Sequence, residues 1–135
     1  MKVVLDTNVF ISGIFWKGDP NKVLRLWKEH KIQLVNSIEI ILEISRILSD
    51  FKIQLPEEAK KAWIHMITLN STIVEPKEKF DIIKDDPTDN KFIDAAIAGK
   101  AEYIVTNDKH LLKIKQFKTV KIITAKEFLH ISNLT

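Results

Sequence analysis

The chain has no cysteine, only three glycines and no long apolar run. The absence of cysteine excludes disulfides, thiolate nucleophiles and cysteine-based zinc sites, and it fits a reducing compartment. The three glycines form neither a P-loop nor a dinucleotide-binding motif. No uncharged apolar stretch approaches the roughly 20 residues of a membrane helix, and the apolar residues at the start are too few for a signal peptide. We therefore expect a soluble, cytoplasmic protein without a membrane partner.

The composition is otherwise that of an ordinary globular domain. The 135 residues predict a single domain over residues 1–135, large enough to bury a core without disulfides. Hydrophobic residues make up 45% of the chain and charged residues 29%, as in most soluble proteins. A formal net charge of +3 permits a nucleic-acid partner but does not by itself indicate one.

Short apolar runs alternate along the chain with segments of helical character. The runs predict strands at residues 2–5, 32–35, 72–74, 103–106 and 120–123. Apolar spacing and capping residues predict helices at about 21–30, 37–48, 56–70, 86–98 (with Gly99 as its C′ residue), 108–114 and after 124. The segments around Trp16 and over 75–85 are expected to be loops. Strands that alternate with helices pair in parallel, so the predicted fold class is α/β, a three-layer α/β/α sandwich around a central parallel sheet of about five strands.

Two acids follow predicted strands closely. Asp6 comes directly after Val3-Val4-Leu5, and Asp108 comes two residues after the strand at 103–106. A carboxylate cannot remain unpaired in a core, and ligands of open α/β sheets bind at the carboxyl ends of the strands. Each acid alone also fits an ordinary Asx turn. Together they predict one acidic site where the two strands end side by side.

Three further acids are candidates for the same site. Glu43 lies on the apolar stripe of the helix 37–48, although a pair with Arg46 at i+3 would also explain it. Asp89 lies about one turn inside the helix that Asp86-Pro87 is expected to open, and structural and functional interpretations of it are evenly matched. Asp94 follows on that helix about 140° away from Asp89, so the two cannot point equally well into one site.

Several carboxylates that share a pocket repel one another unless protons or cations neutralise them. Oxygen ligands without cysteine or a histidine pair suit Mg²⁺ or Mn²⁺ better than zinc. Such ions activate water and stabilise the oxygens of a phosphodiester during its hydrolysis. The acidic residues therefore predict a metal-dependent active site.

The segments that carry these acids resemble those of the PIN-domain ribonucleases, which include the VapC toxins of toxin–antitoxin pairs. The matching parts are residues 4–8 with Ser12, the helical Glu43, residues 86–94 and residues 104–109. They cover nearly the whole chain in the expected order. The resemblance implies a PIN-like strand order of 3-2-1-4-5 and often a homodimer.

The resemblance also implies roles for individual residues. The implied catalytic and metal-binding carboxylates are Asp6, Glu43, Asp89 and Asp108, with Asp94 as a secondary metal candidate. The implied supporting residues are Thr7, Asn8, Ser12 and Thr106. Many relatives have a further aspartate where this chain has His110, which puts a second metal site in doubt.

Basic residues crowd the region after Asp108. Lys109, His110 and Lys113 are candidates for contacts with RNA phosphates beside the acids. A solvated face without a ligand is the other interpretation, and most lysine clusters are of that kind.

From the residues and the resemblance we expect a metal-dependent endoribonuclease that hydrolyses RNA phosphodiester bonds. A toxin role would require a small antitoxin protein, whereas RNA processing would use the same chemistry without one. A PIN-like module with weakened catalysis that binds RNA or protein is the main alternative. A haloacid-dehalogenase-type phosphatase is disfavoured, because its second acid would fall at Asn8.

Overall fold

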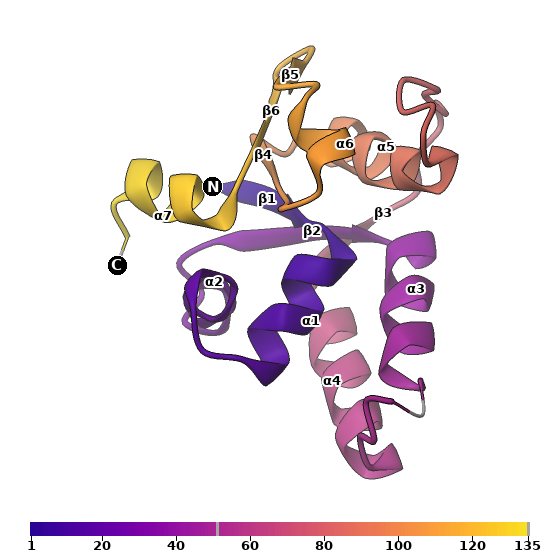
Figure 1. The fold of residues 1–135 in the computed structure, drawn as a ribbon, viewed down its shortest axis with the longest axis vertical. Coiled ribbons are helices and arrows are strands. Elements are labelled where there is room, and N and C mark those ends of the chain that lie inside the picture. The colour runs from indigo at the N-terminus through magenta and orange to yellow at the C-terminus, as the bar shows by residue number, and fades with distance from the viewer. Residues whose placement is uncertain (51, 135) are drawn as a thin grey trace.

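A six-stranded sheet crosses the molecule between helices in the computed structural model, which describes residues 1–50 and 52–134 (Figure 1). The strands are β1 (Lys2–Leu5), β2 (Gln33–Ser37), β3 (Ser71–Val74), β4 (Tyr103–Val105), β5 (Gln116–Phe117) and β6 (Val120–Ile123). The helices are α1 (Thr7–Phe15), α2 (Asp19–Lys28), α3 (Ile38–Leu48), α4 (Glu57–Leu69), α5 (Asn90–Ala98), α6 (Lys109–Leu112) and α7 (Ala125–Ser132), with a 3-10 turn, η1, at Pro87–Asp89.

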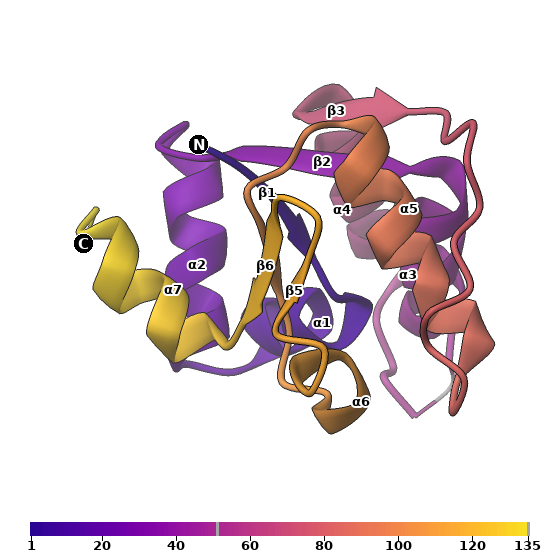
Figure 2. The same ribbon diagram turned by 90° about the horizontal axis from the view of Figure 1, so that it is seen from above.

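The sheet has the order β3-β2-β1-β4-β6-β5, with β1 paired in parallel to both β2 and β4. Helices α1, α2 and α4 lie on one side of the sheet and α5 on the other (Figures 1 and 2). The predicted α/β sandwich and the order of its five parallel strands are confirmed. The addition is β5, which pairs antiparallel with β6 at the sheet edge. A strand of two residues is too short for its periodicity to be recognised.

Helix α1 corrects the expectation of a loop after the first strand. It begins directly after Asp6, whose carboxylate caps it by accepting a hydrogen bond from the Asn8 amide. Its β-branched residues and Gly13 disfavour a helix locally. Burial outweighs this preference, because Phe10 packs edge-on against Trp27 and a Cβ at Gly13 would lie only 2.7 Å from Leu24.

The predicted helix at 86–98 has a different start and end from those expected. Asp86 precedes the 3-10 turn, and the α-helix itself begins only at Asn90. Gly99 is the C-cap with φ −91°, and the left-handed conformation is taken by Lys100 with φ 55°. Gly99 is required instead for close packing, since a Cβ there would lie 2.5 Å from a methyl group of Val35.

The side chain of Asn90 holds the loop between β3 and η1. Its carbonyl oxygen accepts hydrogen bonds from the amides of Ile82 and Ile83, both at 3.0 Å. Its amide group donates to the carbonyls of Ile83 and Pro87 at 3.0 and 2.9 Å. The buried Asn90 thus supplies the backbone partners that this loop would find in regular structure.

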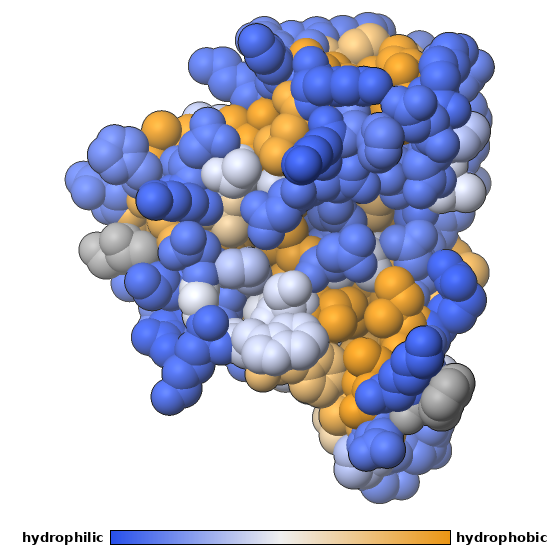
Figure 3. Space-filling model, viewed as in Figure 1, coloured by the Kyte–Doolittle hydropathy of each residue, from blue (hydrophilic) through white to orange (hydrophobic). Residues whose placement is uncertain are grey.

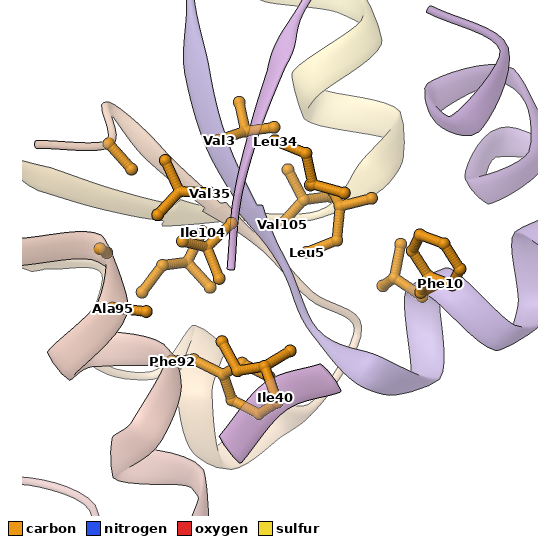
Figure 4. Packing of buried hydrophobic residues seen from close by; sticks show 14 of the residues in the cluster. Val3, Leu5, Phe10, Leu34, Val35, Ile40, Phe92, Ala95, Ile104 and Val105 are labelled. Atoms are coloured by element: carbon orange, nitrogen blue, oxygen red, sulfur yellow. The ribbon is translucent and has the colours of Figure 1, made fainter. Parts of the chain in front are cut away.

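The core fills the space between the sheet and the helices on its two sides. Strand residues such as Val3, Leu34 and Ile104 meet Phe92 of α5 and Ile40 of α3 within one cluster of buried side chains (Figure 4). This packing fixes α3 and α5 relative to the ends of β1 and β4. Hydrophobic residues also reach the surface over α3 and α4 (Figure 3).

No helix within the described ranges is both long enough and apolar enough to cross a bilayer.

Candidate active site

Asp6 lies at the junction of β1 and α1, where the chain leaves the sheet. Its side chain is buried at 5% exposure and accepts hydrogen bonds from the Thr106 hydroxyl at 2.6 Å and the Asn8 amide at 3.2 Å. Burial raises the pKa of the Asp6 carboxyl, and these two hydrogen bonds oppose the rise. The negative charges of Asp108 and Glu43 raise this pKa further. Asp6 is therefore the buried member of a group of acids.

Thr106 connects Asp6 to Asp108 at the ends of two neighbouring strands. The fully buried Thr106 hydroxyl donates to Asp6 Oδ2 and accepts a hydrogen bond from the Asp108 amide at 2.9 Å. The Asp108 carboxylate accepts from the His110 amide at 2.7 Å and so caps α6. Parallel pairing of β1 with β4 produces this arrangement, as the sequence predicted.

Asp89 faces the same group from the start of α5. Its pKa is raised to about 6, first by burial and then by the charges of Asp86, Asp6 and Asp108. The ammonium group of Lys91 opposes this rise. Because the charges of Asp6 and Asp108 both raise the pKa of Asp89, the three carboxylates lie close enough together to repel one another.

Glu43 approaches the other acids from α3 and forms an ion pair. Its side chain is 18% exposed, and Oε2 lies 2.5 Å from Lys91 Nζ and 4.0 Å from Arg46. The alternative pairing with Arg46 therefore exists, but the closer and more buried partner is Lys91. The sequence pattern does not indicate a role for Lys91.

Of the other candidates, Asp94 is not brought to these acids. Its buried carboxylate accepts a hydrogen bond from the Phe80 amide at 2.8 Å. Burial raises the Asp94 pKa, and the nearby charges that act on it are Lys79 and Glu39. The structure thus places Asp94 beside the loop before η1 and gives it a partner there.

The supporting residues on α1 differ in their surroundings. The Thr7 hydroxyl is buried and has no hydrogen-bond partner within residues 1–50 and 52–134. Asn8 is exposed and contributes its backbone amide to Asp6. Ser12 is half-buried, and in the described part of the chain its recorded bond is from the Trp16 amide to its carbonyl. Thr7 is the buried one of the three, so its hydroxyl cannot be satisfied by bulk water.

The basic candidates after Asp108 are partly neutralised. Asp85 Oδ2 lies 3.1 Å from His110 Nδ1 and 2.8 Å from Lys113 Nζ. Hydrogen bonding and attraction by Lys113, then by His110, lower the pKa of Asp85. Lys109 is exposed and forms no ion pair within the described residues. Lys109 therefore remains the most available cation of the three.

The candidate donors are four carboxylates and the hydroxyl of Thr7. Within the described ranges, no three acidic or histidine side chains are already close enough together to hold a metal ion. The charges of neighbouring acids nevertheless raise the pKa values of Asp6 and Asp89, and the Thr7 hydroxyl, which has no partner within the described ranges, lies next to Asp6 in the chain. All the candidate donors are oxygens, which Mg²⁺ and Mn²⁺ prefer. The chemistry of the donor set therefore suits such an ion, although the described residues do not bring three of these donors together.

An open hollow adjoins the acids between α3 and the start of α5. Its volume is about 430 Å³, and it is lined by Glu39, Leu42, Glu43, Arg46, Thr88 and Lys91. Of the four acids, only Glu43 lines this hollow, so the hollow exposes the Glu43–Lys91 pair to solvent.

Comparison with known proteins identifies the family. A family model described as PIN domain matches residues 2–110. The chain belongs to the PIN domain family. Members of this family are generally nucleases, and PIN nucleases generally use divalent metals. The resemblance found in the sequence is thus confirmed.

Two further similarities span most of the PIN-domain chain. An uncharacterized protein of Methanocaldococcus jannaschii is 33% identical over 141 residues, covering 96% of this chain and 90% of the relative. A chain in the crystal structure of VapBC2 from Rickettsia felis bound to a DNA fragment from their promoter has a TM-score of 0.59 at 17% identity. That match covers 90% of this chain and 97% of the VapBC2 chain, and it supports the shared fold.

Proposed function

We propose that this PIN-domain protein is a divalent-metal-dependent endoribonuclease. The observation that carries the proposal is the convergence of Asp6 and Asp108 at the ends of β1 and β4, where the Thr106 hydroxyl joins them. Asp89, at the start of α5, is near enough for the charges of both to raise its pKa. Protein sites that hold acids together in this way are neutralised by cations or protons, and perturbed pKa values cluster at functional sites. The family supplies the nuclease class, while RNA as the substrate is our proposal.

Asp6, Asp89 and Asp108 would hold Mg²⁺ or Mn²⁺, with Glu43 as the fourth acid. When bound, such an ion lowers the pKa of water and stabilises charge on the phosphodiester oxygens. The Thr106 hydroxyl orients the Asp6 carboxylate through its 2.6 Å hydrogen bond. The RNA strand would approach along the hollow beside Glu43, and the exposed Lys109 would contact its phosphates.

RNA cleavage tests the proposal directly. The purified protein is incubated with end-labelled single-stranded and hairpin RNAs in Mn²⁺, in Mg²⁺ and in EDTA. Cleavage should require the metal and should be abolished in Asp6→Asn. The matched control is Asp81→Asn, which removes an exposed acid paired with Lys84 outside the site and should leave cleavage unchanged. An Asp6→Asn variant as active as the parent would refute the assignment.

A binding module without catalysis is the second candidate. The Glu43–Lys91 ion pair favours this candidate, because the pair leaves one of the four acids without a free negative charge for a metal ion. Calorimetric titration with Mn²⁺ separates the two functions. A nuclease should bind the ion with an affinity that Asp6→Asn removes. A module that retains RNA binding in EDTA and binds no Mn²⁺ would replace the nuclease proposal.

We further propose a toxin role with an antitoxin partner and a homodimeric state. The VapBC2 similarity supports this extension through the shared fold. Induced expression of the wild type should arrest growth of a bacterial host, whereas Asp6→Asn should not. RNA cleavage in vitro without growth arrest would favour RNA processing. Light scattering measures the oligomeric state, and a monomer at micromolar concentration would exclude the dimer.

A further inference from the structure

A buried lysine lies among the acids of the candidate site. Lys91 is 8% exposed, although lysine is almost never fully buried unless it is paired. Its Nζ donates to the Thr88 carbonyl at 3.0 Å and lies 2.5 Å from Glu43 Oε2. It also lies 4.9 Å from the centre of the Phe92 ring, which adds a cation–π contact. Lys91 is therefore held in one position by three different groups.

The cation is fixed by two elements that pack together. Lys91 belongs to the first turn of α5 and Glu43 to the middle of α3, and α3 and α5 touch each other in the core. The buried Phe92 and Ile40 lie next to each other between these helices (Figure 4). Because the core sets the spacing of α3 and α5, it also sets the distance between the backbone of Lys91 and Glu43.

We propose that Lys91 is the permanent cation of this site, occupying the position against Glu43 that a second metal ion would take, so that the protein binds one divalent ion. This inference rests on the proposed function. Lys91 then acts as a positioning residue: it holds Glu43 beside the other acids and neutralises its charge. The divalent ion is left to Asp6, Asp89 and Asp108.

Two other observations agree with a single divalent ion. Burial raises the pKa of Asp89, and Lys91 is the cation that opposes this rise, so the charge of Lys91 reaches Asp89 as well as Glu43. His110 follows Asp108 by two residues, and its ring Nδ1 lies 3.1 Å from Asp85. The His110 side chain therefore already has a partner, Asp85, in the loop before η1. The carboxylate of Glu43 is thus paired with Lys91, and His110 has no carboxylate to offer a second ion.

Counting bound Mn²⁺ ions tests the inference. Isothermal titration calorimetry of the wild-type protein should give one ion per chain, and electron paramagnetic resonance should show no coupling between paired Mn²⁺ ions. Lys91→Met removes the ammonium group but keeps the length of the side chain, and this variant should bind two ions per chain. Lys91→Arg retains a cation against Glu43 and should bind one.

Two controls keep the test decisive. Lys79→Met breaks an exposed pair with Glu39 on the same helix as Glu43, at 2.9 Å, and should leave the count at one. If Lys91→Met does not fold, the double variant Glu43→Gln/Lys91→Met removes both buried charges and should fold with one ion.

The possible failures are distinguishable. Two Mn²⁺ ions in the wild type, or an unchanged count and affinity in a folded Lys91→Met, would overturn the inference while leaving the nuclease proposal intact. Absence of any Mn²⁺ binding to the wild type would overturn both.

Discussion

Replacement of Asp89 by asparagine should stabilise the metal-free protein at neutral pH. The folded structure raises the Asp89 pKa from 3.8 to about 6, which at neutral pH corresponds to about 3 kcal/mol of unfavourable free energy. Asp89 is half-exposed, so screening by water reduces this to about 1 kcal/mol. No hydrogen bond within the described residues is recorded for the Asp89 side chain, so asparagine loses no specific bond.

The direction in which the free energy of unfolding changes with pH follows from proton binding by Asp89. The folded state holds the Asp89 proton more tightly than the unfolded chain, so it binds more protons between about pH 4 and pH 6. The free energy of unfolding must therefore fall as the pH rises through this window. Asp89→Asn should match the wild type near pH 4 and exceed it by about 1 kcal/mol at pH 7. Some pH dependence should persist, because burial also raises the pKa values of Asp6 and Asp94.

Urea unfolding in EDTA, followed by tryptophan fluorescence at several pH values, measures these differences. The control is Asp85→Asn, since hydrogen bonding and attraction by Lys113 and His110 lower the Asp85 pKa. That variant should gain no stability at pH 7. An Asp89→Asn protein that is less stable than the wild type at pH 7, or whose advantage is the same at pH 4, would show that the acids do not crowd one another as described.

Three further substitutions test the residues that position the acids and the exposed lysine beside them. Thr106→Val removes the hydroxyl that connects Asp6 and Asp108 and should lower the unfolding free energy by about 2 kcal/mol in urea titrations, whereas Thr106→Ser should retain most of it. Asn90→Ala leaves the buried loop groups unpaired and should cost about 3 kcal/mol in the same assay. Lys109→Glu should weaken RNA binding and flatten its salt dependence more than Lys113→Glu, because Asp85 already pairs with Lys113; equal effects in a filter-binding assay would contradict this.

Much of the sheet was predictable because its strands are short, apolar and separated by helices. The bounds of β1 and β6 match the predicted ranges, and parallel order placed the ends of β1 and β4 together. Helix α1 was missed because its residues have low helix propensity and its stability comes from Phe10 and its packing partners. Such packing depends on segments distant in the sequence, so local patterns could not indicate it.

The polar residues of α5 explain why one part of the site was not foreseen. Every residue from Asn90 to Ala96 is buried, so this stretch has no solvent-exposed face on which polar side chains could be hydrated. Each polar residue in it must then have a partner: Asn90 binds the loop at 82–83, Asp94 binds the Phe80 amide, and Lys91 binds Glu43. A sequence pattern cannot distinguish a lysine of this kind from one on a solvated helix. The distinction depends on the approach of α3 and of the loop before η1, which also explains why Lys91, two residues after Asp89, could neutralise an acid from another helix.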